Sequence, residues 1–132
     1  DTVWVDLDRP TADEDKAVER LARIEVPTRE DMQEIEISSR LYIENGARYM
    51  TATLMCRSDS DSPTTTAVTF ILAGHRLITV RYDEPKPFSL VANKLARQCP
   101  AAISGEIVLM ELLDAIIDRS ADILERIGTE VD

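Results

Sequence analysis

The chain has 132 residues, of which 44% are hydrophobic and 30% are charged, and it carries a formal net charge of −10 at pH 7. The length suits one globular domain, and the composition excludes an intrinsically disordered chain. The negative charge disfavours nucleic acid and anionic membrane surfaces as direct partners, and it favours cations or basic surfaces.

The first third of the sequence predicts one strand followed by two capped helices. The strand is the short β-type run at 3–7. Thr11 with Glu14, and Thr28 with Asp31, are each spaced as the N-cap and the third residue of a capping box. Both helices are expected to bury apolar side chains, namely Val18, Leu21, Ala22 and Ile24 on the first and Met32, Ile35 and Ile37 on the second.

The middle of the sequence predicts two hairpins. Asn45-Gly46 supplies the positive φ of a type I′ turn between β-rich runs at 41–44 and 47–56. Gly74-His75 separates a second pair of runs, 65–73 and 76–82. Residues 67–72 are apolar enough to predict a central strand that is covered on both faces.

Two helices are expected after the strands. The first occupies 88–98 and turns Val91 and Leu95 inward. The second runs from Ser104 to Val131 without a proline. Its apolar residues recur at spacings of three and four, and they predict a broad buried face that consists of Met110, Leu113, Ile117, Leu124, Ile127 and Val131, widened by Leu109, Leu112, Ile116 and Ile123.

The resulting order, β-α-α-β-β-β-β-α-α, predicts an α/β fold. We expect a three-layer α/β/α sandwich with a mixed, largely antiparallel sheet and a long C-terminal helix. Residues 1–132 should form a single soluble domain. No apolar run approaches the ~20 residues that span a bilayer, and the first residue is Asp rather than Met. We therefore expect the chain to be a fragment of a longer protein.

An acidic flank, which runs beside the apolar face of the last helix, has two interpretations. It consists of Glu111, Asp114, Asp118, Asp122 and Glu125, again at spacings of three and four. Like charges at this spacing repel one another unless cations intervene. The flank is either a solvated helix surface or a surface that meets cations or a basic partner.

The sequence contains no recognisable catalytic constellation. His75 is the single histidine, and we expect it in an exposed turn. Cys56 and Cys99 lack metal-ligand spacing, and we expect both to be buried thiols. The four glycines form no phosphate-binding cluster. We therefore expect neither enzyme activity nor an organic cofactor.

The Glu30-Asp31 pair also has two interpretations. Asp31 can simply close the second capping box by accepting the backbone N–H of Thr28. Alternatively, both carboxylates can provide the hard oxygen ligands that Mg²⁺ prefers.

Taken together, these segments resemble the cytoplasmic N-terminal domain of the CorA-type magnesium transporters, including their zinc-transporting branch. The resemblance rests on pieces that occur in a shared order across almost the whole chain: 4–7 with Pro10-Thr11, Glu30-Asp31, 68–72, 76–80, 113–119 and 124–127.

The resemblance implies a homopentamer on the cytoplasmic side of the bacterial inner membrane, in which a long stalk helix continues into two transmembrane helices. It implies regulatory Mg²⁺ between neighbouring subunits, held by Glu30, Asp31, Asp114 and Asp118. The isolated chain should bind this ion weakly, because a partner Asp would lie beyond Asp132. We therefore expect a cation-sensing domain of a divalent metal-ion transporter. The alternatives are a structural module that assembles the pentamer without binding an ion specifically, and the domain of a zinc-transporting relative.

Overall fold

The computed structural model describes residues 2–33, 40–56, 64–98 and 102–131, and at a few positions near the end of the last helix it describes the backbone alone. The order of its elements is the predicted one. The strands are β1 (Trp4–Asp8), β2 (Leu41–Glu44), β3 (Ala47–Cys56), β4 (Thr64–Ala73) and β5 (Arg76–Arg81). The helices are α1 (Ala12–Ala22), α2 (Arg29–Met32), α3 (Lys86–Arg97) and α4 (Gly105–Val131).

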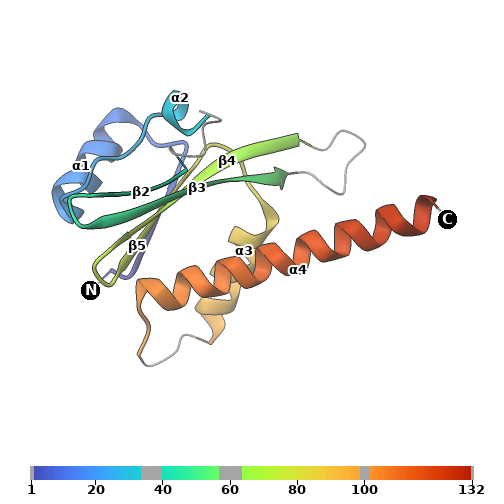
Figure 1. Ribbon diagram of the computed structural model, residues 1–132. Coiled ribbons are helices and arrows are strands. Elements are labelled where there is room, and N and C mark those ends of the chain that lie inside the picture. Colours follow the sequence, from blue (N-terminus) through green and yellow to red (C-terminus); the bar gives the residue numbers. More distant parts are fainter. Residues whose placement is uncertain (1, 34–39, 57–63, 99–101, 132) are drawn as a thin grey trace.

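The strands form one mixed sheet in the order β1-β5-β4-β3-β2. β1 is parallel to β5, and the other pairs are antiparallel. Helices α1 and α2 cover one face, and α3 and α4 cover the other (Figure 1). The α/β/α sandwich predicted from the sequence is therefore confirmed, with β4 as its central strand.

Local signals in the sequence form the structures they predict. Both capping boxes are present: the side chains of Thr11 and Thr28 each accept a hydrogen bond from the third helical N–H, at 3.2 and 3.1 Å. Asn45 and Gly46 have φ values of 51° and 80°, as a type I′ turn requires. His75 is exposed in the second hairpin turn, as expected.

The core between the sheet and helices α1 and α2 is built around Tyr49 and the buried side chains of β4 and β5. Val18 and Met32 enter it from the two helices, as predicted. Leu21, however, is 55% exposed, so its prediction was wrong. Arg23 adopts a left-handed conformation with a φ of 57°, which ends α1 and lets Ile24 pack inward from the following loop. Ile35, Ile37 and Cys99 lie outside the described residues, whereas Cys56 is buried as expected.

The second core, beneath α3 and α4, confirms one border of the predicted inner face of α4, which includes Leu109, Leu112 and Ile116, but the rest of that face points away from the core. Val108 and Leu112 are fully buried against Phe70 and Phe88. The predicted core residues Met110, Ile117 and Leu124 are instead 58%, 64% and 68% exposed. A periodic apolar pattern shows which residues share one face of a helix. The apolar face of α4 is broader than the surface that packs on the sheet, so the pattern alone does not tell which of its residues become buried.

Gly105 begins α4 at a point where the helix touches the turn between β4 and β5. Its N–H donates to the carbonyl of His75 at 2.6 Å. A Cβ at this position would lie 2.5 Å from the backbone nitrogen of Leu77.

We therefore expect Gly105→Ala to destabilise the chain by about 1–3 kcal/mol, because backbone atoms cannot yield to the added methyl group. Urea unfolding measures the change. Gly128→Ala is the matched control, since a Cβ at Gly128 would have no atom within 4 Å and alanine favours helix. Equal effects of the two substitutions would contradict the close packing of α4 on this turn.

Candidate metal centre

The first pair of candidate ligands lies on α2, where it is exposed. Asp31 closes the capping box: its Oδ2 accepts the backbone N–H of Thr28 at 3.2 Å. Its other carboxylate oxygen makes no hydrogen bond to the described residues. Glu30 precedes it on the exposed surface of the helix. Asp31 can therefore cap the helix and bind a cation at the same time, because Oδ2 accepts the N–H of Thr28 and Oδ1 can face a metal ion.

The second pair lies on the acidic flank of α4. Asp114 and Asp118 are one helical turn apart, and both are exposed. Glu111 differs from them, because its carboxylate accepts a hydrogen bond from the Lys94 ammonium group at 2.7 Å and so ties α4 to α3. The flank thus begins in an ion pair at Glu111 and continues with the exposed carboxylates of Asp114 and Asp118.

The fold does not bring the two pairs together. α2 covers one face of the sheet and α4 the other (Figure 1). Within the described residues, no group of three or more His, Cys, Asp and Glu side chains is placed to hold a metal ion. The carboxylates have the hard oxygen chemistry that suits Mg²⁺, but each pair offers only part of a coordination shell. A complete site would need ligands from a second chain or from other segments.

A partly buried ionic network, which was not predicted from the sequence, lies at the junction of β1 and β5. The carboxylate of Asp6 accepts hydrogen bonds from the Arg81 guanidinium at 2.7 and 3.1 Å and from the Thr79 hydroxyl at 2.9 Å. Trp4 in turn donates its indole N–H to Thr79 at 3.0 Å. The guanidinium also lies over the ring of Phe88, 5.1 Å from its centroid.

The contacts of Arg81 within this network keep its guanidinium group positively charged. Burial alone would lower the pKa of Arg81, but the hydrogen bonds and the negative charge of Asp6 outweigh it and raise the pKa. Arg81 therefore stays cationic and paired, which makes the network a structural element of the sheet. A partial signal existed in the sequence, because Asp6 interrupts the apolar residues of β1 and Arg81 follows the apolar residues of β5.

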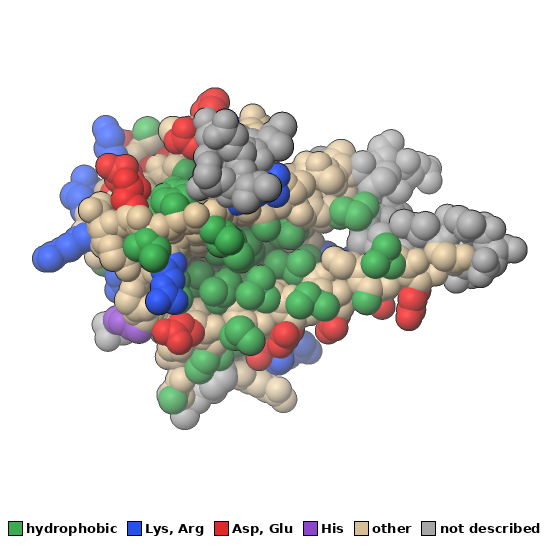
Figure 2. Space-filling view, viewed as in Figure 1, with side chains coloured by type: hydrophobic (Ala, Val, Ile, Leu, Met, Phe, Trp, Pro, Cys, Tyr) green, Lys and Arg blue, Asp and Glu red, His purple; other side chains and the backbone are tan. Residues whose placement is uncertain are grey.

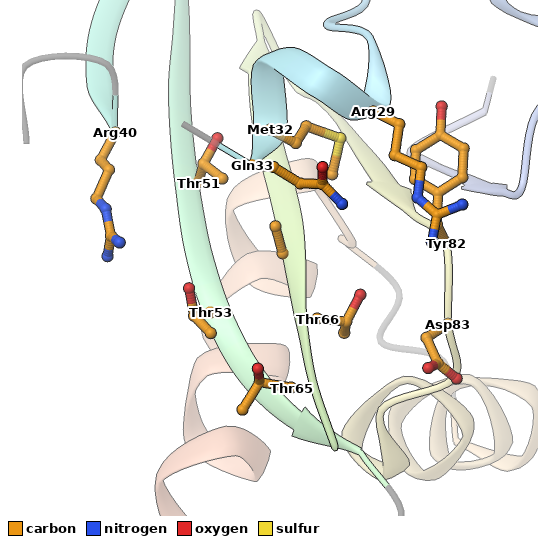
Figure 3. Close-up of a pocket in the computed structure, with 11 residues that line it drawn as sticks. Arg29, Met32, Gln33, Arg40, Thr51, Thr53, Thr65, Thr66, Tyr82 and Asp83 are labelled. Carbon is orange, nitrogen blue, oxygen red and sulfur yellow. The ribbon is translucent and has the colours of Figure 1, made fainter. Parts of the chain in front are cut away.

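A polar pocket of about 320 Å³ lies beside α2 (Figure 3). Arg40 stands on one side and Arg29 with Tyr82 on the other, and threonines of β3 and β4 lie between them. The Arg29 guanidinium is 5.3 Å from the centroid of the Tyr82 ring. Burial, and next the charge of Asp15, raises the pKa of Tyr82, so its phenol is neutral at pH 7. Two guanidinium groups beside one carboxylate, that of Asp83, do not suit Mg²⁺, and neither Glu30 nor Asp31 lines this pocket.

The described parts of the chain therefore define an acidic α/β domain whose candidate site is a set of exposed carboxylates. None of its described helices is long and apolar enough to cross a membrane.

Comparison with known proteins identifies the family. The sequence model of the family described as "CorA-like Mg2+ transporter protein" matches residues 1–132. The chain belongs to this family, which confirms the resemblance stated from the sequence.

Two relatives and one solved structure illustrate the match. The "Magnesium transport protein CorA" of Wolinella succinogenes is 26% identical over 127 residues, which are 93% of this chain and 40% of that protein. The protein of the same name from Salmonella typhimurium is 26% identical over 132 residues, or 100% of this chain and 42% of the relative. The soluble domain of CorA from Methanocaldococcus jannaschii superposes with a TM-score of 0.77 at 18% identity, covering 96% of this chain and 51% of that one. The fold is thus shared, and the chain spans about two fifths of the relatives' length.

Proposed function

We propose that the chain is the regulatory, cation-sensing domain of a CorA-like divalent metal-ion transporter, and that the transported ion is Mg²⁺. The observation that carries this proposal is the family match over all 132 residues. It is supported by relatives whose names describe magnesium transport and by the likeness of the fold to the soluble domain of a CorA protein. In this proposal the domain lies on the cytoplasmic side of the bacterial inner membrane, is part of a homopentamer, and catalyses no reaction.

Sensing, in this proposal, uses the exposed carboxylates. Glu30 and Asp31 of one subunit, and Asp114 and Asp118 of a neighbour, would together hold regulatory Mg²⁺ across the subunit interface. The placement of the two pairs on opposite faces of the sheet favours a site shared between chains over one inside a chain. Bound ions would offset the repulsion between carboxylates and so stabilise the arrangement of subunits that brings them together. The isolated chain should bind the ion weakly, because it offers only half of the ligands at each place.

The capping box gives specific support to a second candidate function. The hydrogen bonds between Thr28 and Asp31 account for the presence of Asp31 without any metal. In that case the domain is a structural module that assembles and spaces the subunits. A zinc-transporting relative is a further alternative for the transported ion.

Cation uptake by the full-length protein tests the transport part of the proposal. We expect proteoliposomes that contain the protein to accumulate Mg²⁺ well above the level of protein-free liposomes, and Zn²⁺ to a smaller extent. The measurement is Mg²⁺ influx with an ion-sensitive dye inside the vesicles. Influx of Zn²⁺ without influx of Mg²⁺ would move the protein to the zinc-transporting branch, and influx of neither ion would refute the proposal.

A further inference from the structure

The polar pocket beside α2 has no role in the proposed function, because none of the four candidate Mg²⁺ ligands is among its lining residues. Its volume of about 320 Å³ lies at the lower end of the range of small-molecule sites. Arg29 and Arg40 approach it from opposite sides (Figure 3). In a chain with a net charge of −10, two guanidinium groups at one hollow are a local concentration of positive charge.

The described residues offset this positive charge only in part. Neither Arg29 nor Arg40 forms an ion pair within the described parts of the chain, and Arg29 instead lies over the ring of Tyr82. The described lining contains one carboxylate, that of Asp83, which shares its charge with Arg9 at a distance of 3.9 Å. Acidic side chains gather instead along α4 (Figure 2), which covers the other face of the sheet. The pocket is therefore suited to an anion.

The sheet supplies hydroxyl groups to the floor of the pocket. Thr53 pairs with Ala67 of β4, whose side chain packs on the side of the sheet that carries α2. Thr51 and Thr65 are each two residues away from this pair along their strands, so they point to the same side. Thr51 shares a hydrogen bond of 2.8 Å with Thr69. The hydroxyls of Thr53 and Thr65 make no hydrogen bond to the described residues, so both can donate to a ligand above the short side chain of Ala67.

We propose that this pocket binds a phosphate group, either as the free ion or as the ester of a small hydroxyl-rich molecule. A guanidinium group offers parallel N–H donors whose spacing matches two phosphate oxygens, and hydroxyl donors suit the remaining oxygens. The oxygens of a phosphate point in several directions, so donors on two sides and on the floor can bind it together. The two oxygens of a carboxylate lie in one plane and would use fewer of these donors. The volume of the pocket exceeds that of a single phosphate ion, which favours the ester.

Titration calorimetry of the full-length protein, in a buffer without phosphate, sulfate or divalent cations, tests the proposal. We expect glucose 6-phosphate to bind with a Kd below about 1 mM. Glucose should bind at least about tenfold more weakly, because it lacks the charged group that the arginines bind. Inorganic phosphate distinguishes the two sources: equal affinity identifies the free ion as the ligand, and weaker binding identifies the ester. Binding of neither phosphate compound, or equal binding of glucose and glucose 6-phosphate, would overturn the proposal.

Single substitutions locate the binding site. Arg29→Gln and Arg40→Gln should each weaken the binding of the phosphate compound at least about tenfold, because each removes a charge-assisted set of hydrogen bonds. Thr53→Val keeps the charge and should weaken binding about threefold, through the loss of one hydroxyl donor. Arg48→Gln is the matched control: Arg48 is exposed on β3 and does not line the pocket.

The control separates a built site from general attraction between opposite charges. We expect Arg48→Gln to bind as the wild type does. Equal weakening by all three arginine substitutions, or unchanged affinity in Arg29→Gln, Arg40→Gln and Thr53→Val, would overturn the proposal. Each of these results leaves Mg²⁺ uptake, and with it the proposed function, unaffected, because the pocket and the candidate Mg²⁺ ligands share no residue.

Discussion

Phe70→Ala is expected to cost about 3–5 kcal/mol of folding free energy, a large part of the stability of a domain of this size. Phe70 is 2% exposed at the middle of β4, the central strand. Its ring stacks on Phe88 of α3 with centroids 6.1 Å apart, and Val108 and Leu112 of α4 belong to the same cluster. Removing the ring leaves a cavity that the sheet, α3 and α4 cannot close without separating their other contacts.

Urea unfolding of the 132-residue chain measures this loss. Leu41→Ala is the control, because Leu41 also lies in a strand and faces the same side of the sheet but is 68% exposed. Its loss should stay below about 1 kcal/mol. If Phe70→Ala cost no more than Leu41→Ala, β4 would not be a strand buried on both faces, and the three-layer arrangement would be wrong.

Asp6→Ala is expected to destabilise the chain by about 1–3 kcal/mol, because it removes the carboxylate that binds the largely buried guanidinium of Arg81 at 2.7 Å and leaves only the more distant carboxylate of Asp8, at 3.6 Å. The side chain of Arg81 is 11% exposed and that of Asp6 is 26% exposed, so water can replace the lost carboxylate only in part. The substitution also removes the acceptor of the Thr79 hydroxyl. The parallel pairing of β1 with β5 depends on this junction, which makes Asp6 more important than its position at an edge strand suggests.

The surface ion pair between Lys94 and Glu111 provides the matched comparison. Its N–O distance is 2.7 Å, the same as in the Asp6–Arg81 pair, but its side chains are 54% and 31% exposed. We expect Glu111→Ala to cost at most about 1 kcal/mol, and less at high salt, because exposed pairs are screened. Similar losses for Asp6→Ala and Glu111→Ala would show that the partial burial of the Asp6 network adds nothing to its strength.

Short-range signals in the sequence predicted most of the fold. A capping box, an Asn-Gly turn or a proline acts within a few residues, so Thr11, Thr28 and Asn45-Gly46 could be placed without knowledge of their surroundings. The order of elements, with four strands between two helical pairs, then restricted the chain to a layered α/β fold.

The predictions that failed concern long-range packing. Leu21 and Ile117 both lie on periodic apolar faces, yet both are exposed in the structure. Periodicity identifies side chains that share a face, whereas burial depends on which neighbouring element that face meets. The network of Asp6 with Arg81 was missed for a similar reason, since its two members are 75 residues apart and meet only through the parallel pairing of β1 with β5.

The candidate site was predictable only in part. Spacing in the sequence placed Asp114 and Asp118 on one flank of a helix, and the structure places both on the exposed surface of α4. The carboxylate chemistry of Glu30 and Asp31 allowed them as ligands and the resemblance to the CorA family supported that assignment, whereas spacing alone favours Asp31 as a helix cap. Ligand sets that are divided between chains leave no local pattern in either chain, so metal binding by these four carboxylates stays a prediction.

The most direct test of the sensing role compares transport by the full-length wild type, Asp31→Asn and Thr28→Ala as the Mg²⁺ concentration on the side of this domain is raised. Asp31→Asn removes the charge of a proposed ligand, whereas Thr28→Ala disturbs only the cap, at a cost of about 1 kcal/mol. A ligand stabilises the closed state only by its preference for that state, so losing a carboxylate should shift the population towards open. We predict that Asp31→Asn remains active at Mg²⁺ concentrations that close the wild type, and that Thr28→Ala closes with the wild type. Superimposable inhibition curves for all three proteins would contradict the sensing role and leave Asp31 as a helix cap in a structural module.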